Sequence, residues 1–421
     1  MKRAIIFLIA LCPLFVTPQS CADSGILIFD AGSTGTRPYL ITAKGPASNM
    51  KLERYAKYKK SNLALSSITG TKDFPNLRRM LQTSIEQALK DIPTACRKQT
   101  GIILQATAGL RAISSALSRL ILDEVKRIFE LSQLKPISTV AAILSGYDEG
   151  LYYWVSVNFL KQTLATGDAK RTFGTMEIGG GSVQITAAIP RERVRSMSRI
   201  VGRSLRDVNI LGKKYSVYSE SFLNGGIQAA RIKFFSADNK GFCLKQGVTV
   251  SYSFNQISNK ILTGKPVKRG ARRYCVCQTM ASRIVRELGV KSFQGNLNSV
   301  KFIAGGVFYY NIHAIHSLEK KCDLKGTAKC NSFVHPTSLK DLRNYGKKYC
   351  SQFYIPKNLE VPFNVVYLCQ DILYILELLE NGWKFNDPAF EYTALEQING
   401  HELSWVLGLG LQLAYEQLNS Q

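Results

Sequence analysis

Two short segments of this chain, residues 30–37 and 177–185, share a pattern that strongly limits the fold. Each places an acidic residue, Asp30 or Glu177, near the end of an apolar run and then turns through glycines and hydroxyl side chains. Backbone N–H groups in such a turn can point into a concavity and bind an anion, and glycine permits the close approach. One such loop is weakly informative, whereas two of them, each led by an acid, predict a pair of facing phosphate loops.

The segments around the two loops repeat a coarse pattern. A short apolar strand is expected before each loop, over residues 25–29 and 173–178. A second strand is expected to return from each loop, over residues 37–42 and 183–188. This internal duplication predicts two similar α/β lobes with a nucleotide cleft between them.

With 421 residues the chain is too long for one ordinary core. Its hydrophobic content of 45% indicates a folded protein rather than a disordered one. We expect residues 23–145 to form lobe I, completed by 395–421, and residues 146–394 to form lobe II. Two stretches that read as irregular, 236–278 and 317–369, are expected to be disulfide-stapled insertions in the second half.

Residues 1–22 are predicted to be a signal peptide. A basic start precedes an apolar core that is too short to span a bilayer, and small residues before Asp23 suit cleavage. No later segment is apolar enough to cross a membrane, so we expect a soluble, secreted protein, either extracellular or periplasmic. Cys12 and Cys21 are expected to leave with this leader.

Eight cysteines would then remain, and an even number in an exported chain favours disulfides. They are Cys96, Cys243, Cys275, Cys277, Cys322, Cys330, Cys350 and Cys369. Cys322 with Cys330 and Cys350 with Cys369 are plausible local pairs. The spacing of the cysteines leaves the connectivity open.

The net charge of +25 attracts polyanions in general and also suits a phosphorylated substrate. The densest basic stretch, residues 191–214, contains Arg193, Arg195, Arg199, Arg203, Arg206 and Lys213. A solvated basic loop is the favoured interpretation, and peripheral contact with an anionic surface such as a membrane is the alternative. Aromatic residues for base stacking are absent until Tyr215, so no specific nucleic-acid partner is expected.

Glu149 is the sharpest single candidate for chemistry. It stands between Gly146 and Gly150 at an expected helix start, where a carboxylate beside a phosphate could deprotonate an attacking water. The ordinary alternative is an acid that only stabilises the N-terminus of the helix. Asp148 is an adjacent competitor for the same role.

Several motifs of the chain resemble those of the nucleoside triphosphate diphosphohydrolases, also called ecto-apyrases. The two loops are similar to that family's Asp-Ala-Gly-Ser-Ser and Gly-Gly-x-Ser-x-Gln-Ile motifs. Residues 106–111 resemble Ala-Thr-Ala-Gly-Met-Arg, and residues 149–154 resemble Glu-Gly-x-Tyr-x-Trp. Further agreement follows in residues 211–223, 305–310 and 404–408, so that the resemblance runs from residue 25 to about 415.

The resemblance implies an actin-like α/β fold of two duplicated RNase H-like lobes. It also implies hydrolysis of nucleoside tri- and diphosphates to monophosphates with Mg²⁺ or Ca²⁺. We expect the protein to be a monomer. Glu149 would be the general base, Ser182 and Gln184 would hold the nucleophilic water, and Tyr310 would stack on the nucleobase. Phosphate would be bound by Gly32, Ser33, Thr34, Gly180, Gly181 and Ser182. The metal would be held through its water shell by Asp30, Thr107, Glu177 and Trp405.

Elementary chemistry agrees with these implied roles. Transfer of a terminal phosphoryl group to water needs positioning and neutralised charge. Hydrated Mg²⁺ suits a site that offers few carboxylates beside the phosphates of the substrate. Two of the implied residues have ordinary explanations as well, because a threonine such as Thr107 at a helix start is usually a cap and a helical tryptophan such as Trp405 is usually core.

The chain departs from the family pattern in three places. Gly35 stands where histidine is frequent, a position that bears on the preference between tri- and diphosphates. Glu177 stands where aspartate is usual, so the water shell of the metal must shift or the backbone must retreat. After Leu223 the chain lacks an arginine that some members place near the base, which leaves nucleobase selectivity open.

Two rival interpretations remain. Exopolyphosphatases and guanosine pentaphosphate phosphohydrolases share the fold and a similar second loop, and a positive charge suits polyphosphate. The leader, the cysteines and residues 149–154 and 215–223 argue against them. A rival of another class is a non-catalytic protein that binds a polyanion or a membrane, and the intact acids Asp30, Glu149 and Glu177 favour an enzyme instead.

Overall fold

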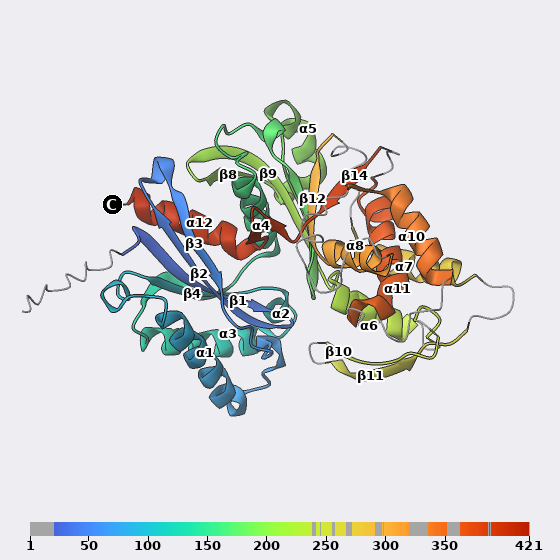
Figure 1. Ribbon diagram of the computed structural model, residues 1–421, viewed down its shortest axis with the longest axis horizontal. Coiled ribbons are helices and arrows are strands. Elements are labelled where there is room, and N and C mark those ends of the chain that lie inside the picture. The colour runs from blue at the N-terminus through green and yellow to red at the C-terminus, as the bar shows by residue number, and fades with distance from the viewer. Residues whose placement is uncertain are drawn as a thin grey trace, which may run out of the picture.

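Two β-sheets, one in each half of the chain, organise the protein (Figure 1). The structure is a computed structural model that describes residues 21–237, 241–244, 246–254, 257–266, 272–290, 297, 299–319, 336–351, 363–385, 387 and 389–420. Within these residues no helix is long and apolar enough to cross a membrane.

The first sheet has five strands in the order β3-β2-β1-β4-β5. They are β1 (Ser24–Gly32), β2 (Gly35–Lys44), β3 (Lys51–Lys57), β4 (Gly101–Ala106) and β5 (Lys135–Ile143). β1 runs antiparallel to β2 in a register that pairs Gly32 with Gly35, so the first glycine loop is the tip of a β-hairpin. β1 also runs parallel to β4, which places the start of residues 106–111 beside that tip.

Helices cover both faces of this sheet, which explains why β1 is apolar throughout. Leu27 and Phe29 pack into a core with α1 (Phe74–Leu89) and α3 (Ser115–Glu130), whereas Ile26 and Ile28 pack against α12 (Trp405–Asn419). A strand buried on both faces needs apolar residues at successive positions rather than at alternate ones. The C-terminal helix therefore belongs to the packing of the first sheet (Figure 1).

The second sheet has seven strands in the order β13-β14-β12-β6-β7-β9-β8. They are β6 (Gly174–Ile178), β7 (Ser182–Ala188), β8 (Leu205–Ile210), β9 (Lys213–Leu223), β12 (Phe302–Gly306), β13 (Pro336–Ser338) and β14 (Glu391–Ala394). β6 pairs antiparallel with β7 and parallel with β12, as β1 does with β2 and β4. The second glycine loop is thus also the tip of a β-hairpin, and the expected duplication is present.

A group of helices packs on the second sheet and lies on the side of it away from the first sheet in Figure 1. They are α6 (Ile227–Ala237), α7 (Arg273–Glu287), α8 (Val307–Leu318), α10 (Leu339–Ser351) and α11 (Leu368–Glu377). Their apolar faces share one core with the strands, including Met176, Ala230 and Ile372.

Helices α4 (Gly146–Leu160) and α12 cross between the two sheets. The crossing is so close that a Cβ at Gly408 would lie 1.9 Å from the carbonyl oxygen of Tyr152. Glycine at this position therefore lets the two helix backbones approach. Because α12 also packs on β1 and β2, this crossing joins the two halves of the molecule.

The prediction of a solvated loop at residues 191–214 is wrong. The stretch forms helix α5 (Arg191–Val201), a 3₁₀ turn and strand β8. Val194, Met197 and Val201 repeat at helical spacing and pack on the core of the second sheet, a period that the density of arginines hid. Strand β9 continues to Leu223, and helix α6 begins at Ile227.

The two stretches expected to be irregular contain regular structure. Residues 236–278 include the hairpin of β10 (Thr249–Phe254) and β11 (Ile257–Thr263) and the start of α7, and residues 317–369 include α10 and the start of α11. Disulfides do hold them: Cys243 bonds Cys277, and the expected pair of Cys350 and Cys369 is confirmed. The pair proposed for Cys322 and Cys330 and the leader residue Cys12 lie outside the described residues.

The expected loss of Cys21 with the leader is contradicted. Cys21 bonds Cys96 at the end of the 3₁₀ turn Thr94–Cys96, so it belongs to the folded chain. Spacing could not show this bond, because its two cysteines are 75 residues apart. Among the described residues Cys275 is left as an exposed thiol.

Candidate active site

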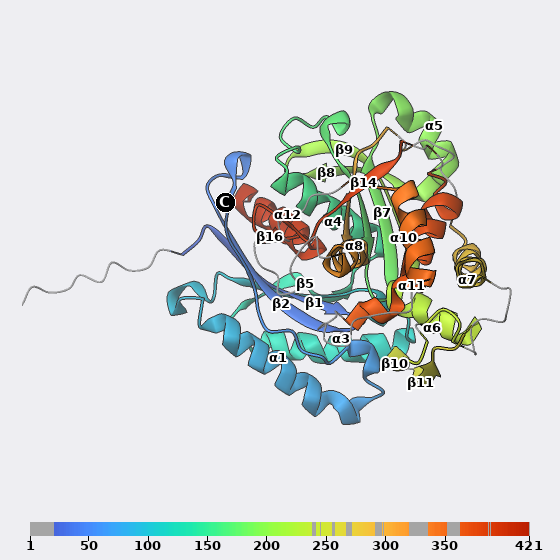
Figure 2. The same ribbon diagram turned by 45° about the vertical axis from the view of Figure 1, so that its right-hand side comes forward.

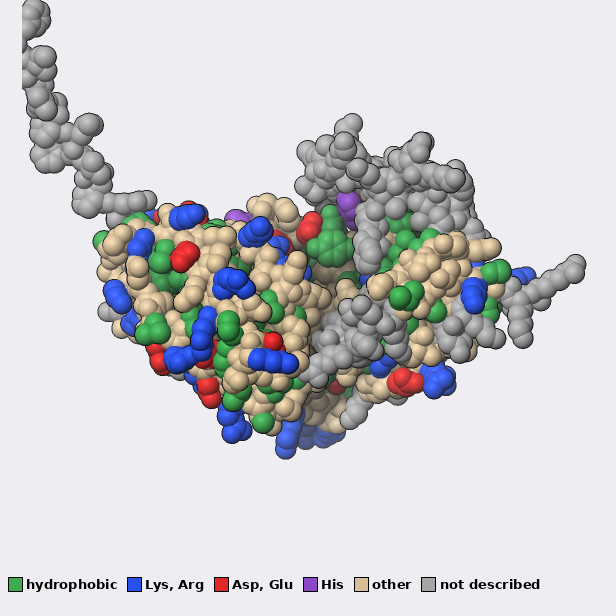
Figure 3. Space-filling model, turned by 90° about the horizontal axis from the view of Figure 1, so that it is seen from below, with side chains coloured by type: hydrophobic (Ala, Val, Ile, Leu, Met, Phe, Trp, Pro, Cys, Tyr) green, Lys and Arg blue, Asp and Glu red, His purple; other side chains and the backbone are tan. Residues whose placement is uncertain are grey.

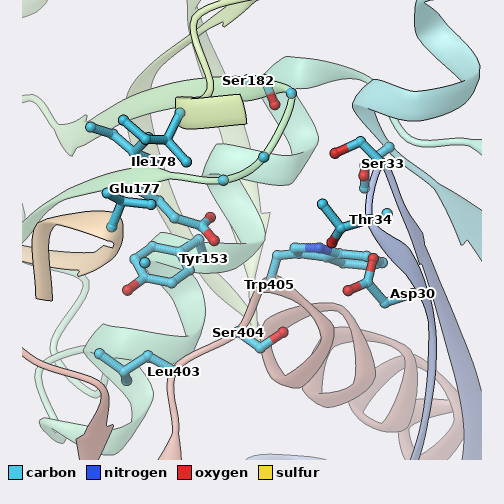
Figure 4. A pocket seen from close by; sticks show the side chains of 18 of the residues that line it. Asp30, Ser33, Thr34, Tyr153, Glu177, Ile178, Ser182, Leu403, Ser404 and Trp405 are labelled. Carbon is cyan, nitrogen blue, oxygen red and sulfur yellow. The ribbon is translucent and has the colours of Figure 1, made fainter. Parts of the chain in front are cut away.

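A cavity of about 680 Å³ lies where the two hairpin tips meet. Its walls come from both sheets. The sequence-predicted residues that line it are Asp30, Gly32, Ser33, Thr34, Thr107, Glu149, Glu177, Gly180, Gly181, Ser182, Tyr310 and Trp405. Figure 4 shows Glu177 and Ser182 on one side and Asp30, Ser33 and Thr34 on the other, with Trp405 between them.

The two glycine loops approach each other closely. A Cβ on Gly180 would lie 2.8 Å from the hydroxyl oxygen of Ser33. A Cβ on Gly181 would lie 2.8 Å from the Cβ of Ala108, which begins the short helix α2 (Ala108–Arg111). Glycine is therefore required at the point where one half of the molecule meets the other.

Glu149 lies in the first turn of α4, and its position in the helix comes from a local cap. Ser145 precedes the helix and its hydroxyl accepts a hydrogen bond from the backbone N–H of Asp148 at 3.1 Å. Glu149 is 7% exposed and lines the cavity, whereas the side chain of Asp148 accepts a hydrogen bond from the Ser145 hydroxyl and does not line the cavity. The geometry thus favours Glu149 over its neighbour.

A hydrogen-bonded network fixes the carboxylate of Glu149. Its Oε2 accepts from Arg111 Nη2 at 2.6 Å and from Gln184 Nε2 at 3.0 Å. Ser182 and Gln184 lie two residues apart on β7 and point to the same face. The Ser182 hydroxyl accepts from Gln184 Nε2 at 2.8 Å and from Arg111 Nη2 at 3.2 Å. Gln184 does not line the cavity, and it acts from behind Glu149 and Ser182.

Sequence reasoning missed two members of this network. Arg111 ends the motif at residues 106–111, and this place in the motif was the available signal. Ser221 lies on β9 opposite Gln184, and its hydroxyl accepts from Gln184 Nε2 at 3.1 Å. Both were passed over because their partners are distant in the sequence.

The three carboxylates predicted from the sequence line the cavity together with Glu396 and Glu402, and burial makes each of the three a stronger base. Burial raises the pKa of Asp30 to about 6 although Arg37 opposes the shift, and it raises the pKa of Glu177 to about 8, with the charges of Glu149 and Asp30 adding to it. Burial also raises the pKa of Glu149, while its bonds to Arg111 oppose the shift. A site of this kind gains from a bound cation.

The residues fit a hydrated cation rather than a directly ligated one. Oε2 of Glu177 is buried without a hydrogen-bond partner among the described residues. The same residues contain no group of three His, Cys, Asp or Glu side chains close enough to ligate one ion. Mg²⁺ commonly keeps several of its waters, which can bridge the ion to carboxylates that stand back from it.

Thr107 and Trp405 both line the cavity, and a role as helix cap or as core residue does not fully explain their positions. Thr107 precedes α2, but its side chain makes no capping hydrogen bond, so the usual role of a threonine at a helix start does not apply. Trp405 is the first residue of α12 and is 4% exposed. It belongs to the core between α12 and the first sheet and also lies beside Asp30 and Thr34 in Figure 4.

The local structure explains why glycine occupies position 35. Its φ is +136°, and a Cβ there would lie 2.2 Å from the carbonyl oxygen of Ser61. The bridge between Thr36 and Ser61 holds the two segments at this distance. A histidine could not occupy this backbone, so the departure from the family pattern is tied to this contact.

The end of the cavity at α8 combines aromatic and charged groups. Tyr310 is 46% exposed, and its hydroxyl donates to Glu396 Oε1 at 3.2 Å. No arginine directly follows Leu223, but Arg231 lines the cavity from α6. Its Nε donates to Asp371 Oδ1 at 3.1 Å. Sequence reasoning missed Arg231 because it searched only the residues directly after Leu223.

Comparison with solved structures agrees with this architecture. A nucleoside triphosphate hydrolase from Neospora caninum matches with a TM-score of 0.65 at 14% identity, covering 94% of each chain. A Ppx/GppA family member from Aquifex aeolicus matches with a TM-score of 0.53 at 11% identity, covering 94% of this chain and 98% of that one. At such identities the likeness shows the fold alone, and it confirms the actin-like α/β fold of two duplicated lobes.

Sequence comparison then identifies the family. The GDA1/CD39 (nucleoside phosphatase) family matches residues 20–421. The human nucleoside diphosphate phosphatase ENTPD5 is 28% identical over 425 residues, covering 97% of this chain and 91% of that protein. Apyrase 1 of Arabidopsis thaliana is 32% identical over 238 residues, 54% of this chain and 49% of that protein. The chain therefore belongs to the GDA1/CD39 family and is an enzyme of the nucleoside phosphatase class, and this family generally depends on divalent cations.

Proposed function

We propose that the protein hydrolyses the terminal phosphate of nucleoside tri- and diphosphates, yielding monophosphates. One observation carries the proposal: the Glu149 carboxylate is fixed by Arg111 and Gln184 beside Ser182, directly next to two facing glycine turns. A base held in this way, beside loops that can bind phosphate oxygens, suits attack of water on a terminal phosphoryl group.

In the proposed mechanism Ser182 and Gln184 position the attacking water and Glu149 takes its proton. The water oxygen forms the new bond to the terminal phosphorus as the bond from phosphorus to the bridging oxygen breaks. The released phosphate keeps the water oxygen, and the shortened nucleotide leaves with the bridging oxygen. Burial strengthens Glu149 as a base, and Arg111 supports the ionised carboxylate that the step requires. Arg111 thus acts through Glu149 as a positioning residue.

The facing turns would hold the phosphates from both lobes. Gly32, Ser33 and Thr34 offer backbone N–H groups and hydroxyls from the first hairpin, and Gly180 and Gly181 do so from the second. Asp30, Glu177, Thr107 and Trp405 would surround Mg²⁺ or Ca²⁺ through its water shell. When bound, the cation neutralises charge on the phosphates.

At the other end of the cavity Tyr310 would stack on the nucleobase. Its half-exposed ring is accessible, and such stacking contributes about 1–3 kcal/mol in other base-binding proteins. We also infer that the protein is exported through an N-terminal leader that is cleaved before Cys21, which the disulfide to Cys96 retains, and that it is a monomer. The lobe boundaries at residues 23–145 with 395–421, and at 146–394, remain predictions of the same proposal.

The experiment is a phosphate-release assay with ATP, ADP and polyphosphate, in the presence and absence of Mg²⁺ or Ca²⁺. Glu149→Gln keeps the size of the side chain but removes the base, so turnover should fall by about 10²–10⁴-fold while a non-hydrolysable nucleotide still binds. Asp148→Asn is the matched control and should retain nearly full turnover.

Three results would contradict the proposal. Cleavage of polyphosphate without cleavage of nucleotides would assign the cavity to the exopolyphosphatase reaction. Failure to cleave either substrate would favour a protein that only binds polyanions or membranes. An equal loss of turnover in both carboxamide variants would remove the special role of Glu149.

A further inference from the structure

Helix α5 carries a stripe of arginines on its exposed face. Arg191, Arg195 and Arg199, here called the arginine stripe, follow one another at four-residue intervals. Residues at this spacing lie on one side of a helix, so the stripe runs for about 12 Å along α5. All three side chains are exposed, whereas Met197 on the other side of α5 is buried.

The fold does not neutralise this stripe. Within the part of the chain that the structure describes, no hydrogen bond or ion pair engages the side chains of the three arginines. Glu192, the acid of the helix, pairs instead with Lys170 at 2.7 Å. Like charges four residues apart disfavour a helix. The arginine stripe therefore destabilises helix α5, and binding to an external anionic partner would give the stripe a function.

Basic charge continues beyond the helix. Arg203 follows in the 3₁₀ turn Gly202–Ser204, and Arg206 on β8 lies 4.0 Å over the ring of Tyr147. Lys213 and Lys214 are exposed at the start of β9. In both ribbon views α5 lies at the outer edge of the molecule (Figure 1 and Figure 2).

The arrangement differs from the ordinary surface of the protein. On the face seen from below, Lys and Arg side chains lie scattered over the left-hand part of the molecule with Asp and Glu side chains among them (Figure 3). None of the stripe residues lines the cavity described above. A partner bound at α5 would therefore touch no residue of the proposed catalytic machinery.

We propose that the arginine stripe docks the protein on the surface of a bilayer that contains anionic lipids. The charge of the stripe is complementary to such a surface, and juxtamembrane basic residues bind it electrostatically. Stacking on nucleic-acid bases needs exposed aromatic rings, and Tyr215, the first aromatic residue after the basic stretch, is buried.

The test is sedimentation of the full chain with vesicles of phosphatidylcholine alone or with about 30% phosphatidylserine, an anionic lipid. Binding should require the anionic lipid and should weaken as salt rises, because the Debye length falls from about 10 Å at 0.1 M to about 3 Å at 1 M. Changing Arg191, Arg195 and Arg199 together to glutamine should lower the partition coefficient on the order of 100-fold, at about fivefold for each basic residue.

The control carries the same change of net charge elsewhere. Lys51, Lys72 and Lys90 are exposed on the first lobe, and their replacement by glutamine should leave binding within a few-fold of the original. Hydrolysis of ATP without vesicles should be the same in both triple variants, which shows that each is folded. Equal weakening of both variants would overturn the proposal, since net charge alone would then explain the binding.

Two other results would also overturn it. One is the absence of binding to phosphatidylserine vesicles by the unmodified protein. The other is displacement from these vesicles by an equal charge concentration of single-stranded RNA, with RNA binding that depends on the same arginines. That result would identify the stripe as a site for nucleic acid. Neither result depends on whether the cavity hydrolyses nucleotides, so this proposal and the proposed function can fail separately.

Discussion

The close contact between the two halves of the molecule makes Gly181 a sensitive position. In Gly181→Ala the added Cβ would lie 2.8 Å from the Cβ of Ala108, whereas nonbonded carbons normally rest about 3.5–4.0 Å apart. Ala108 is buried and has no side-chain torsion that could relieve the contact. The second hairpin must therefore move away from α2 by roughly 1 Å.

A displacement of this size should affect catalysis more than stability. Gly181 is adjacent to Ser182, so the shift would move the proposed water-binding group relative to the first hairpin. Misplacement of a reacting group by about 1 Å can cost about 10²-fold in rate. We therefore expect kcat/KM for ATP to fall about 100-fold, equivalent to about 2.7 kcal/mol of transition-state stabilisation.

The control lies in the same turn. In Gly179→Ala the nearest atom to the new Cβ would be the carbonyl oxygen of Ser182 at 3.6 Å, an ordinary contact, so kcat/KM should stay within a few-fold. Adding Ala108→Gly to Gly181→Ala removes the opposing methyl group and should restore most of the lost activity. Equal kinetics for the two single variants, or no rescue in the double variant, would refute the argument from close contact.

Three further predictions follow from the site and the disulfides. The folded-state pKa values of about 6 for Asp30 and about 8 for Glu177 exceed the ordinary carboxyl values. The metal-free fold should therefore lose stability as pH rises from about 4 to about 8, and Glu177→Gln should flatten the upper part of this decline in thermal unfolding. Cys21→Ser opens a bond between residues 75 apart and should cost about 4 kcal/mol in denaturant unfolding, and peptide mapping of the purified protein without reduction should find Cys21 joined to Cys96. Gly35→His should lower the midpoint temperature of thermal unfolding, because the backbone at residue 35 cannot accommodate a side chain. The ratio of kcat/KM for triphosphates to kcat/KM for diphosphates should stay unchanged.

The parts of the fold that local rules govern could be predicted from the sequence. An acid at the end of an apolar strand, followed by glycines, predicted both hairpin tips, and the repeat predicted the two lobes. The same rules failed at residues 191–214, where arginines concealed the apolar period of α5. They also failed at Cys21, whose partner Cys96 is supplied only by the folded chain.

The candidate site shows the same division. Motifs placed Glu149, Ser182 and Gln184, and Gln184 bonds both of the others. The second link between Glu149 and Ser182 runs through Arg111, which is 38 residues from Glu149 and 71 from Ser182 in the sequence. No local pattern reports such a contact, because strand order and helix packing bring the residues together. The motif at residues 106–111 contained the arginine without indicating which atoms it would contact.

The two hairpins are similar in form but differ in how their acids are balanced. Asp30 has Arg37 beside it, at 3.4 Å from Nη1 to Oδ2, and this charge opposes the effect of burial on its pKa. Glu177 has no hydrogen-bond partner for Oε2 among the described residues, and the neighbouring charges of Glu149 and Asp30 raise its pKa further. The second hairpin therefore has the greater electrostatic need for a cation. Since Glu177 is also where the chain departs from the aspartate usual in its family, the longer side chain and the unbalanced charge occur at the same position, and we expect Glu177→Asp to change cation affinity more than nucleotide affinity.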